Sequence, residues 1–285
     1  TNVAPILVIA AVASINETGI ATLTGTIADP GTLDKFTLVV DWGDSLSPDN
    51  VTTHTYQPSA TGVQAFTQTH HYLDDNPTAT DSDTYTISAT LTDDDTLIDS
   101  VITTVAVNNV APILVLDPVV AINEDGRATL TGTISDSGTL DTFTLLVDWG
   151  DPLSPDNTTT HTYAASATGS QTFELTHQYL DDNPTATVSD TYTITATVTD
   201  DDTLAGSADT TVAVENVAPI LVLDPVAAID EDGTATLTGM ITDPGTLDTF
   251  TLVVGWGDQL SPDNTTPQKY QDSTRDRQSF PQQSH

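Results

Sequence analysis

The sequence predicts an all-β protein, and three observations support this. Apolar and polar residues alternate with a period of two over several segments, which is typical of strands with one buried face. Threonine occurs 55 times and occupies much of the polar face of these segments, where a β-branched side chain is favoured. Turn-forming groups of Asp, Asn, Pro and Gly separate the segments, and no segment shows helical periodicity.

Seven strands follow one another in the first 107 residues. The clearest one places Tyr85, Ile87, Ala89 and Leu91 on one side and Thr and Ser residues on the other. We expect strands near residues 6–12, 20–28, 34–42, 51–56, 63–72, 82–93 and 98–107. Seven short alternating strands in about 100 residues indicate an immunoglobulin-like antiparallel β-sandwich.

One sequence unit repeats along the chain. Asn-Val-Ala-Pro occurs at residues 2–5, 109–112 and 216–219, so the period is 107 residues. When residues 5–111 are aligned on 112–218, 79 of 107 positions are identical. A unit of this length is a complete domain, so we predict tandem β-sandwich domains in a linear array. The predicted units are a first repeat at 1–107, a second at 108–214 and a partial third at 215–266 that contains the first strands only.

The last residues depart from the repeat. Three of the five cations, Lys269, Arg275 and Arg277, lie in the segment 267–285. We expect this tail to be disordered or to result from a frameshift, and a genuine divergent terminus is the alternative. A copy that ends here supplies three strands and at most a fourth, which would leave strand edges and apolar surface exposed.

The net charge excludes two kinds of partner. The chain carries 41 acidic and 5 basic residues, a formal charge of −36, whereas nucleic acids and anionic membranes require a basic face. The longest apolar run, from Val3 to Ile15, is too short to insert in a membrane and has no basic start typical of a signal peptide. With no Cys there is no disulfide framework. The remaining partners are a protein or carbohydrate surface ligand and neighbouring repeats of the same chain.

Acidic clusters in the predicted loops point to calcium as the one candidate cofactor. Calcium takes six to eight oxygen ligands, and its binding would relieve repulsion between crowded carboxylates. The alternative is a set of acidic turns that stay solvated. The candidate ligands are Asp74, Asp75, Asn76, Asp93, Asp94 and Asp95, with their copies Asp181, Asp182, Asn183, Asp200, Asp201 and Asp202. The junction acids Asn16-Glu17, Glu124-Asp125 and Glu231-Asp232 would join such a site if they approach the loops of a neighbouring repeat.

The histidines and tryptophans are expected to be structural. His70, His71 and His177 lie on strands beside Tyr72 and Tyr179, where packing or surface roles are expected. Each copy has one Trp at the same turn, which we expect in the core. No nucleophile elbow, phosphate loop, His-Glu-x-x-His or dinucleotide motif occurs, so we predict no catalytic residues and no enzyme activity.

Three motifs in order resemble the PKD (polycystic kidney disease) domain. They are Asp41-Trp42-Gly43-Asp44, then His70-His71-Tyr72, and then the strand that runs from Asp83 to Asp93. The usual marks of that family are a WGDG turn, an H-x-Y and a YTVTLTVTD strand. The second copy repeats all three motifs.

The motifs also depart from the family pattern. Ser45 or Pro152 stands where the family has the last Gly of the turn, and Gly255 replaces the first Asp in the third copy. The Asn-Val-Ala-Pro linker and the Leu-Asp-Asp-Asn-Pro loop are similar to those of tandem PKD-like repeats in large bacterial surface proteins of the adhesin type.

The resemblance implies PKD-like β-sandwich modules at the bacterial cell surface or in the extracellular space. We therefore expect a non-catalytic repeat region that acts as a semi-rigid spacer or adhesion module of a large cell-surface protein. The alternative is an accessory module of a secreted hydrolase that binds carbohydrate or protein. Calcium would stabilise either one.

Overall fold

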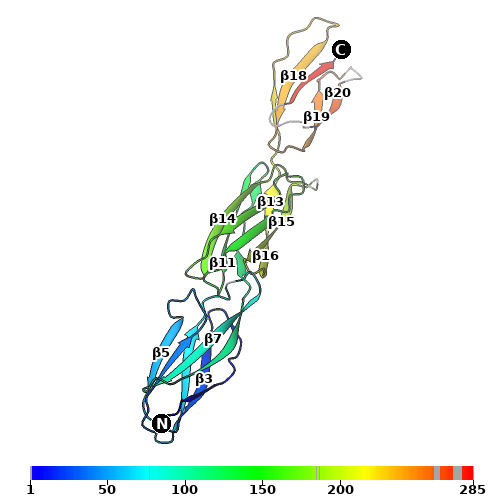
Figure 1. Ribbon diagram of the computed structural model, residues 1–285. Coiled ribbons are helices and arrows are strands. Elements are labelled where there is room, and N and C mark those ends of the chain that lie inside the picture. The colour runs from blue at the N-terminus through cyan, green and yellow to red at the C-terminus, as the bar shows by residue number, and fades with distance from the viewer. Residues whose placement is uncertain are drawn as a thin grey trace.

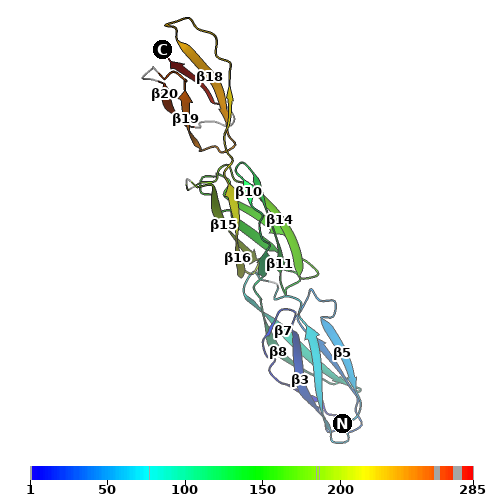
Figure 2. The ribbon, with the colours of Figure 1, turned by 180° about the vertical axis from the view of Figure 1, so that it is seen from behind.

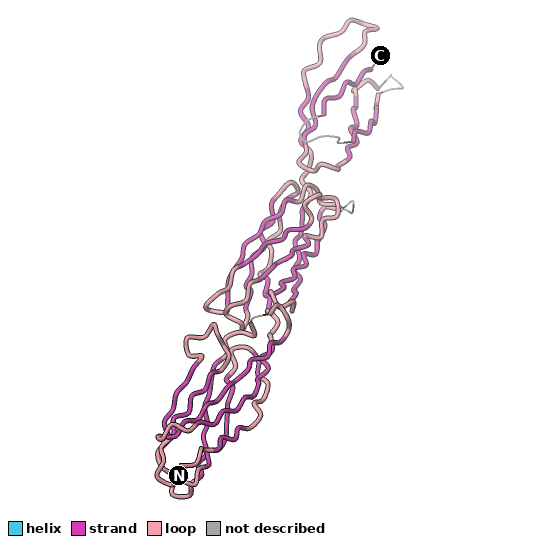
Figure 3. The backbone as a smooth tube through the Cα atoms, in the orientation of Figure 1, coloured by secondary structure: helices cyan, strands magenta, loops and turns pink. Residues whose placement is uncertain are grey.

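The protein consists of three β-sheet units in a row, one for each repeat. The computed structural model describes residues 2–76, 78–183, 185, 187–259, 264–271 and 278–284. Strands, turns and loops make up these residues, with no helix among them, which confirms the all-β class (Figure 3). Accordingly, no helix in the described part of the chain is long and apolar enough to span a membrane. Both ribbon views show the units end to end, with the N-terminus at one end of the row and the C-terminus in the third unit (Figures 1 and 2).

The first repeat is a sandwich of two sheets. One sheet has five strands in the order β2-β8-β7-β4-β5, and the other has three in the order β1-β3-β6. All pairs are antiparallel except that of β2 with β8, which is parallel. The strands are β1 (Ile6–Ile9), β2 (Ile15–Asn16), β3 (Ile20–Ala28), β4 (Phe36–Asp41), β5 (Val51–Tyr56), β6 (Val63–His71), β7 (Ser82–Asp93) and β8 (Ile98–Asn108).

The second repeat has the same topology. Its sheets have the orders β10-β16-β15-β12-β13 and β14-β11-β9. The strands are β9 (Ile113–Leu116), β10 (Ile122–Asn123), β11 (Arg127–Ser135), β12 (Phe143–Asp148), β13 (Thr158–Tyr163), β14 (Ser170–Gln178), β15 (Ser189–Asp200) and β16 (Ala205–Glu215).

All seven strands expected in the first repeat are present, so the immunoglobulin-like sandwich is confirmed. The strand expected near 6–12 is shorter and ends at Ile9. β2 was not predicted, because two residues are too few to show an alternation. The Leu-Asp-Asp-Asn-Pro loop of the first repeat is described except for Pro77, which lies outside the described residues.

The tryptophans of the two complete repeats are in the core, as expected, and so are His70 and His177, whereas His71 is exposed. Trp42 is fully buried, and the Tyr72 hydroxyl donates to its carbonyl oxygen at 2.7 Å. His70 stacks on the Trp42 ring with centroids 5.3 Å apart, and its Nε2 lies 3.0 Å from Asp44 Oδ2. The second repeat reproduces this cluster with Trp149, His177, Tyr179 and Asp151. These groups are therefore committed to packing.

The third repeat has a smaller core. Its described strands form one sheet in the order β17-β18-β21 and a second of β19 and β20. The strands are β17 (Ile220–Leu223), β18 (Ala235–Thr242), β19 (Thr249–Gly255), β20 (Thr265–Gln271) and β21 (Gln278–Ser284). β12 pairs with both β13 and β15, whereas β19 pairs only with β20 among the described strands. Trp256 is accordingly only partly buried.

The tail, which we expect to be disordered or to result from a frameshift, is described in part. The described part of 267–285 contains most of β20 and all of β21, while residues 272–277 and 285 lie outside the described residues. Phe280 pairs with Gly239 in the register in which Phe173 pairs with Gly132. Phe280 also stands one period after Phe173, and Tyr270 one period after Tyr163, a signal that the change of composition hides. The coding DNA tests whether the tail is an in-frame, diverged continuation or the product of a shifted reading frame.

Candidate metal centres at the repeat junctions

Glu17 lies at the C-terminal end of the first repeat because of β2. The parallel pairing of Ile15 with Val107 brings this short strand to the end of β8, and the Glu17 amide donates to Asn108 O at 2.9 Å. Glu17 is 2% exposed, and its Oε1 accepts a hydrogen bond of 2.8 Å from the Val110 amide in the linker. The other carboxylate oxygen, Oε2, has no hydrogen-bond partner among the described residues.

Asp74 and Asp75 lie at the same end, in the loop after β6. The Tyr85 hydroxyl donates to the carbonyl oxygens of Asp74 and Asn76, which anchors this loop on the core strand β7. Both Asp side chains are buried. Asp74 Oδ1 and both oxygens of Asp75 have no hydrogen-bond partner in the described part of the chain. We call Glu17, Asp74 and Asp75 the C-terminal half-site of the first repeat.

The second repeat presents carboxylates at its N-terminal end. Asp136 follows β11, and its Oδ1 accepts a hydrogen bond of 3.0 Å from the Gly138 amide. Asp141 precedes β12 and is 1% exposed, and Asp202 lies in the turn after β15. We call Asp136, Gly138, Asp141 and Asp202 the N-terminal half-site of the second repeat.

The two half-sites meet at the first junction. Three groups of carboxylates each have ligand atoms within 4.8 Å of one another: Glu17 with Asp74 and Asp75, Glu17 with Asp136 and Asp141, and Asp74 with Asp141 and Asp202. Glu17, Asp74 and Asp141 each belong to two groups, so these side chains can bridge adjacent cations. Six carboxylates match the charge of three divalent ions.

Gly138 permits this close approach. A Cβ atom at this position would lie 2.2 Å from Glu17 Oε2 and 2.4 Å from Asp141 Oδ2, which is closer than such atoms can pack. Only a residue without a side chain lets both carboxylates lie against the backbone here. The glycine is thus part of the site.

Burial and mutual repulsion raise the pKa values of these carboxyl groups. Desolvation, with the charge of Asp136 adding to it, raises the pKa of Glu17 to about 8. Desolvation, followed by the charges of Glu17 and Asp74, raises the pKa of Asp141 to about 9. The pKa of Asp75 rises to about 7 for the same reasons, burial first and then the charge of Asp202. No Lys or Arg of the described residues forms a salt bridge with them. A bound divalent cation would favour the ionised carboxylates and so oppose these shifts.

The second junction repeats the arrangement with fewer groups. Glu124, Asp181, Asp182 and Asp248 have ligand atoms within 4.8 Å of one another. Glu124 Oε1 accepts a hydrogen bond of 2.6 Å from the Val217 amide, just as Glu17 does from Val110. A Cβ at Gly245 would lie 2.3 Å from Glu124 Oε2. The position one period after Asp202 falls beyond the 285 residues, so the described part of this junction has no counterpart of that ligand.

The structure brings together only some of the predicted site residues. Asp74 and Asp75 do not meet Asp93–Asp95 of their own repeat, because β7 separates the two clusters along its length. Asp74 instead meets Asp202 of the following repeat. Asp200 and Asp201 shape the turn, since Asp200 accepts from the Leu204 amide and Asp201 from the Thr142 amide.

The predicted Asn ligands and the junction residues also fall into two groups, those close to a carboxylate cluster and those outside it. Asn76 and Asn183 hold the neighbouring Asp74 and Asp181 side chains through their amides. Of the junction acids, Glu17 and Glu124 approach the next repeat as anticipated, whereas Asn16, Asp125, Glu231 and Asp232 belong to none of the carboxylate groups among the described residues.

Asp136, Asp141 and Asp248 were not among the predicted ligands. A usable signal was present, because Asp-x-Gly-Thr-Leu-Asp occurs once in every copy, at 29–34, 136–141 and 243–248. A pair of carboxylates around an unvarying glycine is not by itself diagnostic of a metal site. Its partner Glu17 is 119 residues away from Asp136 in the sequence, so spacing could not join the two.

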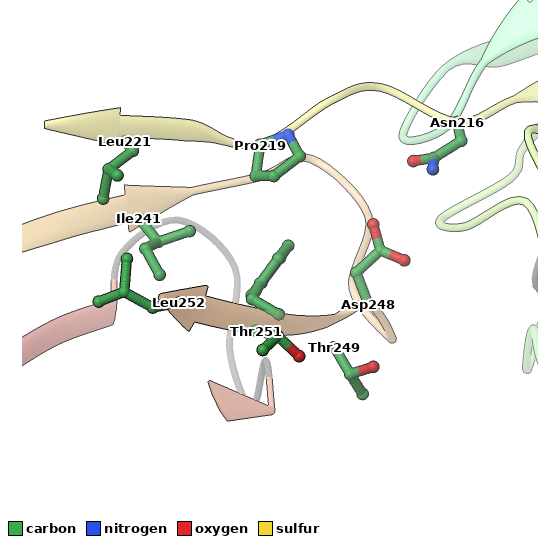
Figure 4. Close-up of a pocket in the computed structure, with 9 residues that line it drawn as sticks. Asn216, Pro219, Leu221, Ile241, Asp248, Thr249, Thr251 and Leu252 are labelled. Atoms are coloured by element: carbon green, nitrogen blue, oxygen red, sulfur yellow. The ribbon is translucent and has the colours of Figure 1, made fainter. Parts of the chain in front are cut away.

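One cavity of the third repeat needs a separate explanation. Figure 4 shows Leu221, Ile241 and Leu252 around a cavity of about 340 Å³ between β17, β18 and β19. In the second repeat, Tyr192 and Ile194 of β15 belong to the buried core of the sandwich, and the described third repeat has no counterpart of β15. The cavity is a gap in the sandwich core, while Asp248 at its edge belongs to the second junction.

The fold and its junctions define the class, a tandem array of immunoglobulin-like β-sandwich repeats, as the PKD resemblance implies. No protein-family model matches the chain, and no curated protein matches it. Among solved structures it is similar to a tetra-tandem repeat in the extending region of a large adhesion protein, at 18% identity and a TM-score of 0.42, over 95% of this chain and 66% of that one.

Two further similarities are to immunoglobulin domains. One is to Dpr2 Ig1-Ig2 in complex with DIP-Theta Ig1-Ig3, with 12% identity and a TM-score of 0.33 over 98% of each chain. The other is to a marsupial T cell receptor, with 9% identity and a TM-score of 0.30 over 98% of this chain and 99% of that one. With TM-scores below 0.5, none of these similarities assigns a function to this chain.

Proposed function

We propose that the chain is a non-catalytic spacer or adhesion region of a large extracellular, cell-surface protein, and that calcium at the junctions holds its repeats in line. One observation carries the proposal: buried carboxylates of consecutive repeats converge with oxygens that lack hydrogen-bond partners among the described residues. Such oxygens are costly in a folded protein unless a cation or a proton compensates them.

Repulsion between the ionised carboxylates makes a cation necessary once the pH exceeds their raised pKa values. Two unit charges about 5 Å apart repel by about 3 kcal/mol at an effective dielectric constant of about 20. Several such pairs occur at the first junction, where the ligand atoms of each group lie within 4.8 Å. Calcium suits the site because carboxylate oxygens are its usual ligands, and extracellular modules bind it at about 0.1 to 1 mM.

The ligands come from both sides of each linker, so binding would restrain bending. Glu17 holds the linker through Val110 and would share a cation with Asp136 and Asp141. Opening the joint would separate these ligands from the ion. A cation that binds only the closed joint stabilises it by mass action.

Small-angle scattering of the full chain at pH 9, where Glu17 is ionised, in excess calcium and in chelator tests the proposal. We expect an extended, narrow distance distribution with calcium and a broader one without it, together with a melting temperature several degrees higher with calcium. Glu17→Gln combined with Glu124→Gln should give the chelator profile in both buffers. Asp209→Asn, an exposed change of the same kind in the middle of β16, should leave the calcium response intact. Superimposable profiles and melts in the two buffers would refute the calcium joint.

The spacer role has its own test in the full-length gene. We expect many more copies of this unit and a surface anchor. A single adjacent hydrolase domain would instead favour the accessory-module alternative.

A further inference from the structure

The N-terminal end of the first repeat carries a second example of the N-terminal half-site. Asp29, Gly31 and Asp34 stand one period before Asp136, Gly138 and Asp141. The Gly31 amide donates to Asp29 Oδ1 at 2.6 Å, which is the contact that Gly138 makes with Asp136. A Cβ at Gly31 would lie 2.0 Å from Asp34 Oδ2, so this glycine also makes room for a carboxylate.

The turn beside these residues is built in the same way. Asn2 Nδ2 donates to Asp93 Oδ2 at 2.8 Å, and Asn109 Nδ2 donates to Asp200 Oδ2 at 2.9 Å. The Leu97 amide donates to Asp93 Oδ1 at 2.8 Å, as the Leu204 amide does to Asp200. Asp95 stands one period before the junction ligand Asp202, and it lies in a turn with the same hydrogen bonds.

The carboxylates of this end contain buried oxygens that need a partner. Asp29 is 6% exposed, and its Oδ2 has no hydrogen-bond partner among the described residues. Asp34 Oδ2 has none either within the same residues. At the first junction the equivalent oxygens of Asp136 and Asp141 meet Glu17 of the preceding repeat.

The described chain supplies no third C-terminal half-site for this end. Its two half-sites, Glu17 with Asp74 and Asp75, and Glu124 with Asp181 and Asp182, both face the repeat that follows them. The matching occupant is thus a C-terminal half-site of the same chemistry: one Glu and an Asp-Asp loop on a further repeat of this sequence.

We propose that the N-terminal end of the first repeat, formed by Asp29, Gly31, Asp34 and Asp95, binds the C-terminal half-site of a further repeat through shared divalent cations. This inference rests on the proposed function, because it uses the same junction chemistry. It adds a specific interaction surface and a specific partner. Two positions near this end differ in charge: Lys35 stands where the second repeat has Thr142, and Asp99 stands where it has Gly206.

An extended chain tests the inference. A copy of residues 1–107 is joined ahead of Thr1, so that Val107 leads into Asn2-Val3-Ala4-Pro5 with Thr1 in the place of Asn108. The unextended and the extended chains are titrated with calcium by calorimetry. We expect the extended chain to bind additional ions, as many as the first junction holds, and scattering to show a longer rod without a bend.

Variants assign the added ions to this surface. Asp34→Asn, or separately Asp29→Asn, placed in the original first repeat of the extended chain, should remove the added ions and leave those of the two existing junctions. Asp209→Asn, exposed on β16, should remove none. If the unextended chain binds calcium and the extension adds no ions, this inference is wrong while the proposed function stands. If the unextended chain binds no calcium, the proposed function fails, and the inference fails with it.

Discussion

The two junctions use the same half-sites but differ in the number of carboxylate groups. The first has three groups that share Glu17, Asp74 and Asp141, whereas the second has one group of four carboxylates. The third repeat lacks, among its described strands, a counterpart of β15 and of the turn that carries Asp202. The full set of carboxylates therefore needs the turn after β15, because the ligands come from two separate loops of each repeat.

Removing the bridging glutamate should have the largest effect. Glu17→Gln takes one charged ligand from two of the three groups, so we expect calcium affinity at the first junction to fall about 100-fold. The second junction should be unchanged. Glu124→Gln should instead weaken calcium binding at the second junction and leave the first unchanged. Calorimetric titration of both variants measures the two affinities. Equal losses at both junctions in either variant would mean that the two centres are not independent.

A methyl group on the glycine should act more weakly. The Cβ of Gly138→Ala would crowd the oxygens of Glu17 and Asp141, so we expect about tenfold weaker calcium binding at the first junction only. Gly245→Ala is the matched change at the second junction, where the crowded group is Glu124. If calcium titration shows wild-type affinity for both variants, the close approach of the carboxylates to the glycine has no role in binding.

In chelator, rising pH should open the two junctions over different pH ranges. Ordinary carboxyl pKa values are near 4, and burial raises those of Glu17 and Asp141 to about 8 and about 9. A carboxyl whose pKa is raised in the closed joint stabilises that joint fully below its ordinary pKa, and this contribution is lost as pH rises through the raised value. The first junction should therefore loosen as pH approaches about 8 to 9.

The second junction should loosen at lower pH. Burial raises the pKa of Glu124 to about 7 and that of Asp248 to about 6. Since the chain has no Cys, dyes on cysteines introduced at Ser100 and Thr162, or at Thr162 and Thr251, report on each joint by energy transfer. Excess calcium should keep both joints closed at pH 9, because it binds the ionised carboxylates. Identical pH midpoints for the two joints would contradict the assigned difference.

The smallest effect is expected from Asp202→Asn. This change removes one carboxylate from one group and makes the first junction resemble the second. We expect one fewer bound ion per chain and little change in the rod dimensions. A count of bound calcium at saturation measures the loss, with Asp209→Asn as the control. An unchanged count would show that Asp202 is not a ligand.

The pattern of neighbouring residues was sufficient to identify the strands and the repeats, but it was insufficient to locate the candidate metal centres. Tyr85, Ile87, Ala89 and Leu91 alternate along β7 because each must face the core, so the strand can be identified from its own residues. The two-residue β2 shows no such alternation, yet it is the element that delivers Glu17 to the junction. The tail is hard to interpret for a similar reason: its composition changes although Tyr270 and Phe280 keep the period.

The sequence by itself determined the class, the order of the strands and the 107-residue unit, because burial on one face of a strand imposes a pattern on neighbouring residues. It also showed that the acidic residues gather in loops. Only the tertiary structure decided which loops meet. Asp74 faces Asp141 and Asp202 of the next repeat rather than Asp93 of its own, because the sandwich places successive loops at opposite ends and stacking joins one end to the next. Contacts between repeats depend on that geometry, which no local pattern of residues records.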